Sequence, residues 1–351
     1  MSSLEVRGSP STAARTAVSA AVIVAMCLFG LGVYHAVALF KGARTQIQVP
    51  TDAGAPALSG KVYVEQSSAI YRFDHGSFRR ITAEEGWMQP SVSPDGGELV
   101  AVKRGVNRSD LYVLGSTGRV PMPLTNNQSQ SVEGNHWAFY PRFSPDASTV
   151  YFSYDLKDPY NNYRVDLAIF STSADPQSSN AVQWTQPNQY TGGDVEPVPL
   201  QRGGLIYTKF SIDDQSVVHS QVWFQAAPGS AGTGLSKPAD DCAQPALSKD
   251  ETMVAMVCRH GGLQSADLEV ASFDAAAPAL GEPVVLVRGG LVASPAFSPD
   301  GKLLAFLAPV EPSGPFQLWT VASSATPASA PRQITRRLDL DPSSAPAWTA
   351  A

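Results

Sequence analysis

The stretch Pro90-Ser-Val-Ser-Pro-Asp-Gly96, followed by the apolar run Leu99-Val-Ala-Val102, decides the fold of this chain because it recurs. Clear copies begin at Pro141, Pro245 and Pro295, and degenerate copies begin at Pro197 and Pro346. The leading prolines are therefore 51, 56, 48, 50 and 51 residues apart. A repeat of this length, with several short strands in each copy, is typical of the blades of a β-propeller.

Each copy predicts a four-stranded blade. Ser-Pro-Asp-Gly suits a tight turn, because Pro presets φ, Asp bonds the neighbouring backbone and Gly accepts positive φ. The strands that return from these turns are nearly continuous apolar runs, as expected when both faces of a sheet are covered; they are residues 99–102, 150–152, 205–207, 253–257 and 303–307. A third strand and a more polar edge strand follow in each copy.

The two ends of the chain are predicted to share one blade. Five complete blades begin at Pro90, Pro141, Pro197, Pro245 and Pro295, whereas Pro346 begins an innermost strand with almost no sequence after it. Residues 61–65, 69–73 and 78–82 read as the three missing strands. We therefore expect an all-β fold over residues 61–351, a six-bladed propeller whose N-terminal and C-terminal strands close the last blade.

The Pro-x-x-Ser-Pro-Asp-Gly unit and its apolar strand resemble the WD-like repeat of TolB-type β-propellers, over residues 61–351. The Gly-His and Trp-Asp pairs of true WD repeats are absent. TolB acts in cell-envelope assembly and carries a soluble α/β domain ahead of its propeller, so the resemblance implies a propeller of the cell envelope. In this chain a predicted membrane segment takes the place of that domain.

The N-terminal region is predicted to anchor the chain in a membrane. After a tail of residues 1–15, residues 16–40 form an apolar stretch, and Ala17 to Leu39 include no Asp, Glu, Lys or Arg. This length suffices for a transmembrane helix, here a signal anchor. The alternative is a signal peptide cleaved near Ala38, which would release a secreted protein. Residues 41–60 read as a linker, and basic residues flank the helix on both sides, which leaves the orientation open.

Cys242 and Cys258 indicate the cellular compartment in which the propeller lies. They lie on either side of the turn at residues 248–251, which places them almost opposite each other on adjacent strands. We expect a disulfide bond, and hence an extracytoplasmic location for the propeller. Two reduced core cysteines are the alternative.

Composition and motifs argue against several functions. Residues 61–351 hold 21 basic and 29 acidic residues, a net charge of −8, so we expect no nucleic-acid partner. The chain has no Gly-x-Ser-x-Gly elbow. The propeller histidines are scattered without metal-ligand spacing, so we expect no metal, no cofactor and no catalytic residue; they are His75, His136, His219 and His260.

The segments just before the innermost strands are expected to gather at one mouth of the central channel. They bring aromatic residues in blades 1 and 2 and acidic residues in blades 3 and 4, so the candidate binding residues are Trp87, His136, Trp137, Tyr140, Asp194, Glu196, Asp240 and Asp241. Aromatic anchors are common in protein interfaces. The alternative is that the aromatic residues pack between blades and the acids are merely solvated.

Together these features predict a membrane-anchored, non-catalytic module for binding or scaffolding, with a protein or peptide partner. The first alternative is a carbohydrate-active or other hydrolytic propeller enzyme that uses the channel mouth. The second is a sensor domain that passes a signal through the single helix.

Overall fold

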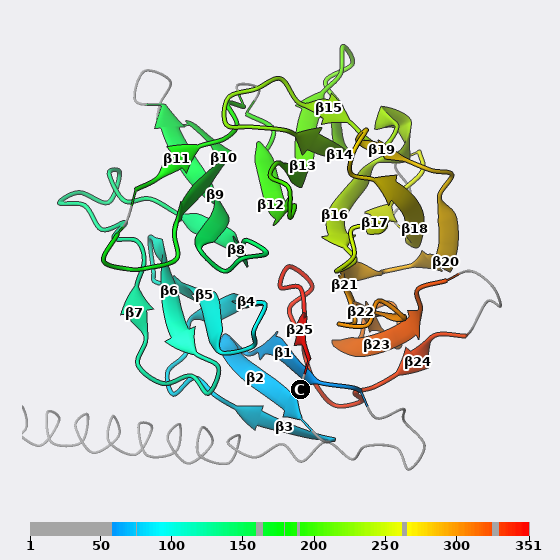
Figure 1. Ribbon diagram of the computed structural model, residues 1–351, viewed down its shortest axis with the longest axis horizontal. Helices are drawn as coiled ribbons and strands as arrows, with labels where there is room; N and C mark the ends of the chain where they lie inside the picture. Colours follow the sequence, from blue (N-terminus) through cyan, green and yellow to red (C-terminus); the bar gives the residue numbers. More distant parts are fainter. Residues whose placement is uncertain are drawn as a thin grey trace, which may run out of the picture. The chain divides into compact units, whose positions relative to one another are not determined.

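A computed structural model describes residues 58–74, 76–158, 164–178, 180–187, 190–261, 265–324 and 330–350, all within the compact unit Gln48–Ala351. In this unit six antiparallel sheets stand around a central axis as the blades of a propeller (Figure 1). The predicted tail and membrane helix, and the linker up to residue 57, lie outside the described residues. Within the described ranges, no helix is long and apolar enough to cross a bilayer.

The first three blades each have four strands, ordered from the axis outwards (Figure 1). Blade 1 consists of β4 (Trp87–Val92), β5 (Glu98–Arg104), β6 (Ser109–Gly115) and β7 (Met122–Pro123). Blade 2 consists of β8 (Ala138–Phe143), β9 (Thr149–Asp158), β10 (Arg164–Ser173) and β11 (Val182–Gln183). Blade 3 consists of β12 (Asp194–Pro199), β13 (Leu205–Ile212), β14 (Val218–Gln225) and β15 (Thr233–Gly234).

Blade 4 departs from the prediction by one strand. It consists of β16 (Cys242–Leu247), β17 (Met253–Cys258), β18 (Ala266–Asp274), β19 (Ala279–Leu280) and β20 (Val284–Gly290), and the short helix η1 (Pro238–Asp240) precedes it. Because β19 pairs only with Phe273 and Asp274, the rest of the β18 edge remains open, and β20 pairs there. Blade 5 has the expected four strands, β21 (Ala293–Phe297), β22 (Leu303–Pro309), β23 (Phe316–Ala322) and β24 (Arg332–Gln333).

The two termini of the propeller share blade 6, as the sequence predicts. It consists of β25 (Ala347–Thr349), β1 (Lys61–Gln66), β2 (Ala69–Asp74) and β3 (Ser77–Arg80). β25 pairs with β1 in the register Lys61 to Thr349 and Tyr63 to Ala347. The indole Nε1–H of Trp348 also donates to the carbonyl oxygen of Ser59 at 2.7 Å. The innermost strand therefore comes from one end of the chain and the outer three come from the other.

The apolar core is divided among the boundaries between blades. One cluster joins Met88 and Val100 of blade 1 to Val150 and Phe152 of blade 2, and similar clusters lie at the next three boundaries. Another joins blade 6 to blade 1 and contains Tyr63. This arrangement explains why the second strand of each blade is apolar on both faces, since each sheet is covered by two neighbours.

The repeated Ser-x-Asp sequence builds the hairpin turn after the innermost strand in four blades. In each, the serine Oγ donates to the aspartate Oδ1, at 2.6, 2.5, 2.6 and 2.7 Å in blades 1, 2, 4 and 5. The same Oγ accepts the backbone N–H of the first residue of the returning strand, at 2.9 to 3.0 Å. These serine hydrogen bonds lower the pKa of the aspartates Asp95, Asp146, Asp250 and Asp300.

The proline that opens each copy marks a β-bulge in the innermost strand. In blades 1 to 5 the pairing register shifts at this proline, and the residue before it has a positive φ of 51° to 58°. A residue before proline is disfavoured in the right-handed helical region, and a bulge re-aims side chains. The five residues with this conformation are Gln89, Tyr140, Glu196, Gln244 and Ser294.

Candidate functional site

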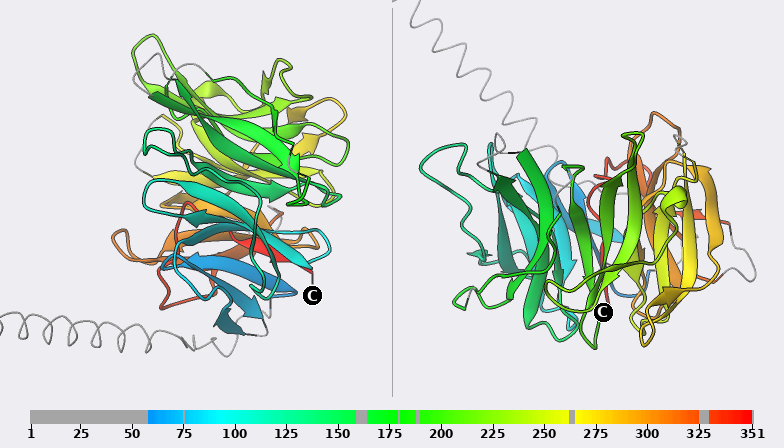
Figure 2. Two further views of the ribbon diagram at one scale, coloured as in Figure 1. Left: turned by 90° about the vertical axis from the view of Figure 1, so that its left-hand side faces the viewer. Right: turned by 90° about the horizontal axis from the view of Figure 1, so that it is seen from above.

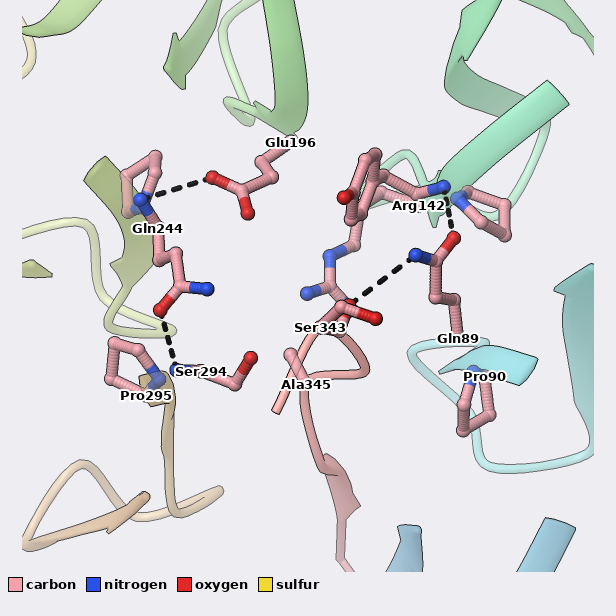
Figure 3. Close-up of a pocket in the computed structure, with 12 residues that line it drawn as sticks. Gln89, Pro90, Arg142, Glu196, Gln244, Ser294, Pro295, Ser343 and Ala345 are labelled. Carbon is pink, nitrogen blue, oxygen red and sulfur yellow. Dashed lines mark hydrogen bonds between the residues drawn. The ribbon is translucent and has the colours of Figure 1, made fainter. Parts of the chain in front are cut away.

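The five residues before the repeat prolines surround the axis of the ring, where they line a small cavity of about 30 Å³. Blade 6 contributes Ser343 and Ala345, so all six blades meet there (Figure 3). The side views show most strands running from one face of the ring towards the other (Figure 2). We call this cavity the channel.

Hydrogen bonds connect neighbouring blades around the channel. The backbone N–H of Tyr140 donates to Oε1 of Gln89 at 2.7 Å, and that of Ser294 donates to Oε1 of Gln244 at 2.8 Å. The N–H of Gln244 donates to Oε2 of Glu196 at 3.0 Å. In each case the side chain of one blade satisfies the backbone N–H of the next, because the bulge removes that N–H from the ladder. These hydrogen bonds, which we call the relay, hold the residues of the channel wall in place.

The relay is interrupted between blades 2 and 3, where two ionisable side chains, Arg142 and Glu196, enter the channel. Oε2 of Glu196 accepts a hydrogen bond from Oγ1 of Thr208 at 2.7 Å, and burial raises the pKa of Glu196. Arg142, two residues beyond Tyr140, extends into the same space (Figure 3). Among the described residues its guanidinium has neither a hydrogen bond nor a salt bridge, and burial lowers its pKa.

A further buried carboxyl adjoins the channel at blade 6. Glu65 on β1 is 5% exposed, and its Oε2 has no hydrogen-bond partner among the described residues. Burial raises the pKa of Glu65 to about 8, and the negative charge of Asp341 adds to the increase. Hydrogen bonds from Ser344 and from the backbone of Gln89 act in the opposite direction. This carboxyl therefore keeps its proton to a higher pH than an ordinary glutamate does.

The channel adjoins a recess of about 530 Å³ that is lined by residues of blades 2 to 5. The channel and the recess share Tyr140, Glu196 and Gln244. The recess wall is mainly apolar, and its apolar side chains are Leu167, Val195, Phe210, Ala243, Val257, Ala266, Leu291, Val292 and Phe316. Asp241 and Arg259 are its charged residues beside Glu196. Leu291 is 41% exposed, so an apolar side chain lies open to solvent at this site.

Three of the predicted site residues meet at the recess. Tyr140, Glu196 and Asp241 all line it, although they come from blade 2, blade 3 and the segment before blade 4. Oδ1 of Asp241 accepts hydrogen bonds from Nδ1 of His219 at 2.9 Å and from the backbone N–H of Ser220 at 3.2 Å. Three of the eight candidate residues, two of them carboxyl groups, therefore lie in the wall of the recess.

The other predicted aromatic residues lie elsewhere. Trp87 is buried in the core between blades 6 and 1. Trp137 stacks on Phe139 with ring centroids 5.9 Å apart. Nδ1 of His136 lies 2.8 Å from Oδ1 of Asp155. None of the three lines the recess among its described residues.

The remaining predicted acids are paired with cations of the protein itself. Asp194 is buried, and its Oδ1 lies 3.1 Å from Nζ of Lys209. Oδ1 of Asp240 lies 3.5 Å from Nδ1 of His260. Together with the bond from His219 to Asp241, these contacts give three of the four predicted acids a partner within the protein. His75 lies outside the described residues.

The prediction missed the channel residues Gln89, Arg142, Gln244 and Ser294. The sequence does contain a guide to them, because each adjoins a repeat proline. Aligning the copies on that proline would have selected the positions on either side of it. The bulge that turns the residue before the proline towards the axis is a backbone feature that strand alternation alone does not predict.

The predicted disulfide is present. Cys242 and Cys258 are directly paired on β16 and β17, with Cα atoms 4.0 Å apart and the sulfurs bonded. Both residues are buried between blades 3 and 4.

Solved structures share this architecture at low sequence identity. TolB from Acinetobacter baumannii matches with a TM-score of 0.64 and 17% identity, over 84% of this chain and 68% of that one. A putative TolB from Agrobacterium tumefaciens matches with a TM-score of 0.50 and 18% identity, over 66% of this chain and 79% of that one. The fold is that of a TolB-like β-propeller.

The same fold carries other activities. Oligogalacturonate lyase from Vibrio parahaemolyticus matches this TolB-like propeller with a TM-score of 0.52 and 13% identity, over 76% of this chain and 71% of that one. At such identities the likeness concerns the fold alone, and function has to be argued from the site. No protein-family model and no curated protein matches the sequence.

Proposed function

We propose that this chain is a membrane-anchored propeller on the extracytoplasmic side that binds a segment of another protein in the recess, without catalysis. The observation that carries the proposal is the recess itself. It combines a volume of about 530 Å³ and an apolar wall with a few polar groups at Tyr140, Glu196 and Gln244. Binding sites commonly have this composition, because apolar walls supply affinity and a few polar groups fix orientation.

Other features of the chain support the proposed membrane anchor and the proposed extracytoplasmic location. Residues 16–40 are long and apolar enough for a membrane helix. The disulfide between Cys242 and Cys258 is of a kind that persists in oxidising compartments, which supports an extracytoplasmic propeller. Accessibility of the propeller to an added protease in sealed spheroplasts or right-side-out vesicles tests this orientation, since protection would place it on the other side.

Site-specific photo-crosslinking of the full-length chain in its own membrane tests the recess. The photoreactive residue replaces Leu291, which is 41% exposed in the recess, or Val182, which is 42% exposed on the outer strand β11. We expect a discrete protein cross-link from position 291 and none from position 182. Phe210→Ser, a second change in the recess wall, should abolish that cross-link.

Two results would count against the proposal. Equal labelling from positions 291 and 182 would show that the recess has no special affinity for protein. Absence of protein cross-links, combined with saturable binding of an oligosaccharide to the purified protein, would favour the carbohydrate-active alternative.

A further inference from the structure

Arg142 is an exception to the repeat in which it lies. The residue after the repeat proline is Ser91 in blade 1, Val198 in blade 3, Ala246 in blade 4 and Ala296 in blade 5, but it is Arg142 in blade 2. The other blades form the same bulge with small or apolar residues at this position. The fold therefore does not require a long cationic side chain there.

The negative charge of Glu196 attracts the guanidinium, but the cost of burial is larger, so the pKa of Arg142 is lowered overall. Among the described residues, no carboxylate forms a salt bridge with Arg142 and no acceptor forms a hydrogen bond with it. The nearby carboxylate of Glu196 is engaged instead by Thr208 and Gln244. Taking a charge out of water without a partner is unfavourable. The attraction of Glu196 therefore offsets only part of the cost of burying the Arg142 charge.

The position of Arg142 connects it to the recess. Its neighbour Tyr140 and the facing Glu196 line both the channel and the recess, so the space beside Arg142 adjoins the recess. The channel cavity of about 30 Å³ has room for about two water-sized groups. Thr208 and the backbone of Gln244 donate hydrogen bonds to Oε2 of Glu196, on the other side of this space.

We propose that Arg142 binds a carboxylate of the protein segment that occupies the recess, either its C-terminal carboxylate or an Asp or Glu side chain. This inference rests on the proposed function and names the chemistry that anchors the partner. A carboxylate is small and planar, and it forms paired, charge-assisted hydrogen bonds with a guanidinium. The apolar wall of the recess then holds the side chains next to that carboxylate.

The first experiment measures thermal stability without a ligand. Arg142→Met removes a cation whose cost of burial exceeds the attraction by Glu196, so it should raise Tm by about 2–4 °C. Arg108→Met is the matched control, since Nε of Arg108 lies 3.3 Å from Oδ2 of Asp110, and it should leave Tm unchanged or lower. A lower Tm for Arg142→Met would show that the guanidinium is structural and would overturn the inference.

The second experiment measures binding to the full-length protein in nanodiscs. The probes are four pools of labelled random pentapeptides, which end in a carboxylate or a carboxamide and either include or omit Asp and Glu. We expect binding to wild type to require a carboxylate, and Arg142→Gln to weaken it at least ~10-fold. The pool that retains binding identifies the terminal or the side-chain source.

Different results would contradict the role of Arg142 and the role of the recess. Peptides that bind equally well with and without carboxylates, and equally to Arg142→Gln, would overturn the role of Arg142 and leave the recess as a binding site. Failure of all four pools to bind, with no cross-link from position 291, would overturn both.

Discussion

Ser294 of blade 5 donates its backbone N–H to the side-chain oxygen of Gln244 in blade 4, at a distance of 2.8 Å. Gln244 in turn donates its own N–H to Glu196 of blade 3. Each of these residues lies at a bulge, where the strand ladder does not use the N–H. The polar side chains around the channel therefore hold adjacent blades together, in addition to the apolar clusters between them.

Gln244→Ala tests this coupling. The substitution removes the acceptor of the Ser294 N–H, and leaving a buried donor unsatisfied costs about 1–3 kcal/mol. The free energy of unfolding, measured in urea, should fall by that amount. Gln215→Ala, at an exposed turn, is the control and should change it by less than ~0.5 kcal/mol. Equal effects of the two substitutions would show that the relay adds no stability.

The propeller could be predicted because the sequence features that indicate it recur from blade to blade. The proline spacing, the turn sequence and the apolar returning strands predicted six blades, the shared blade 6 and the pair Cys242 and Cys258. The strand β20 was not predicted, since it is an addition to one blade and has no counterpart in the repeat.

The channel mouth was harder to predict because exposure depends on packing that the sequence does not contain. Trp87 and Tyr140 both belong to innermost strands and both are aromatic. One side chain enters the core between blades and the other lines the recess, because they stand at different distances from the bulge. Asp194 likewise resembles a free carboxylate in the sequence, although Lys209 on the next strand pairs with it.

Glu65 predicts a pH dependence of stability. Its pKa is about 8 in the folded protein, above the ordinary value of 4.5. A raised pKa means that the folded state holds the proton more tightly, so the contribution to stability is complete below pH 4.5 and is lost as pH rises through 8. Between these values the free energy of unfolding should fall by up to ~1.4 kcal/mol per pH unit.

Glu65→Gln isolates this contribution. The amide is neutral at every pH, so the difference in unfolding free energy between variant and wild type should grow in favour of the variant from pH 5 to pH 8.5. Urea titrations at intervals of half a pH unit measure it. Parallel pH profiles for the two proteins would mean that Glu65 titrates at its ordinary pKa.

The disulfide predicts a large loss of stability in a double variant. Cys242 and Cys258 are separated by 16 positions, and cross-linking a loop of this size restricts the unfolded chain by about 3 kcal/mol. Cys242→Ala combined with Cys258→Ala should lower the free energy of unfolding by that amount. Wild type measured in a strong reductant should approach the variant. A reductant without effect on wild type, in samples whose thiols are shown to be free, would contradict the entropic account.

Two equivalent hairpin turns allow opposite substitutions to be compared at the same position of the repeat. Ala147 in blade 2 and Gly301 in blade 5 occupy the same place after Ser-Pro-Asp, with φ of 62° and 71°. A side chain at positive φ is strained, whereas glycine is not. Nothing lies within 4 Å of a Cβ added at Gly301, so conformation alone should decide the effect there. Ala147→Gly should therefore raise the unfolding free energy by ~0.5–1 kcal/mol, and Gly301→Ala should lower it by a similar amount. Urea unfolding of both variants measures the pair, and changes of the same sign would show that the two turns do not share one conformational preference.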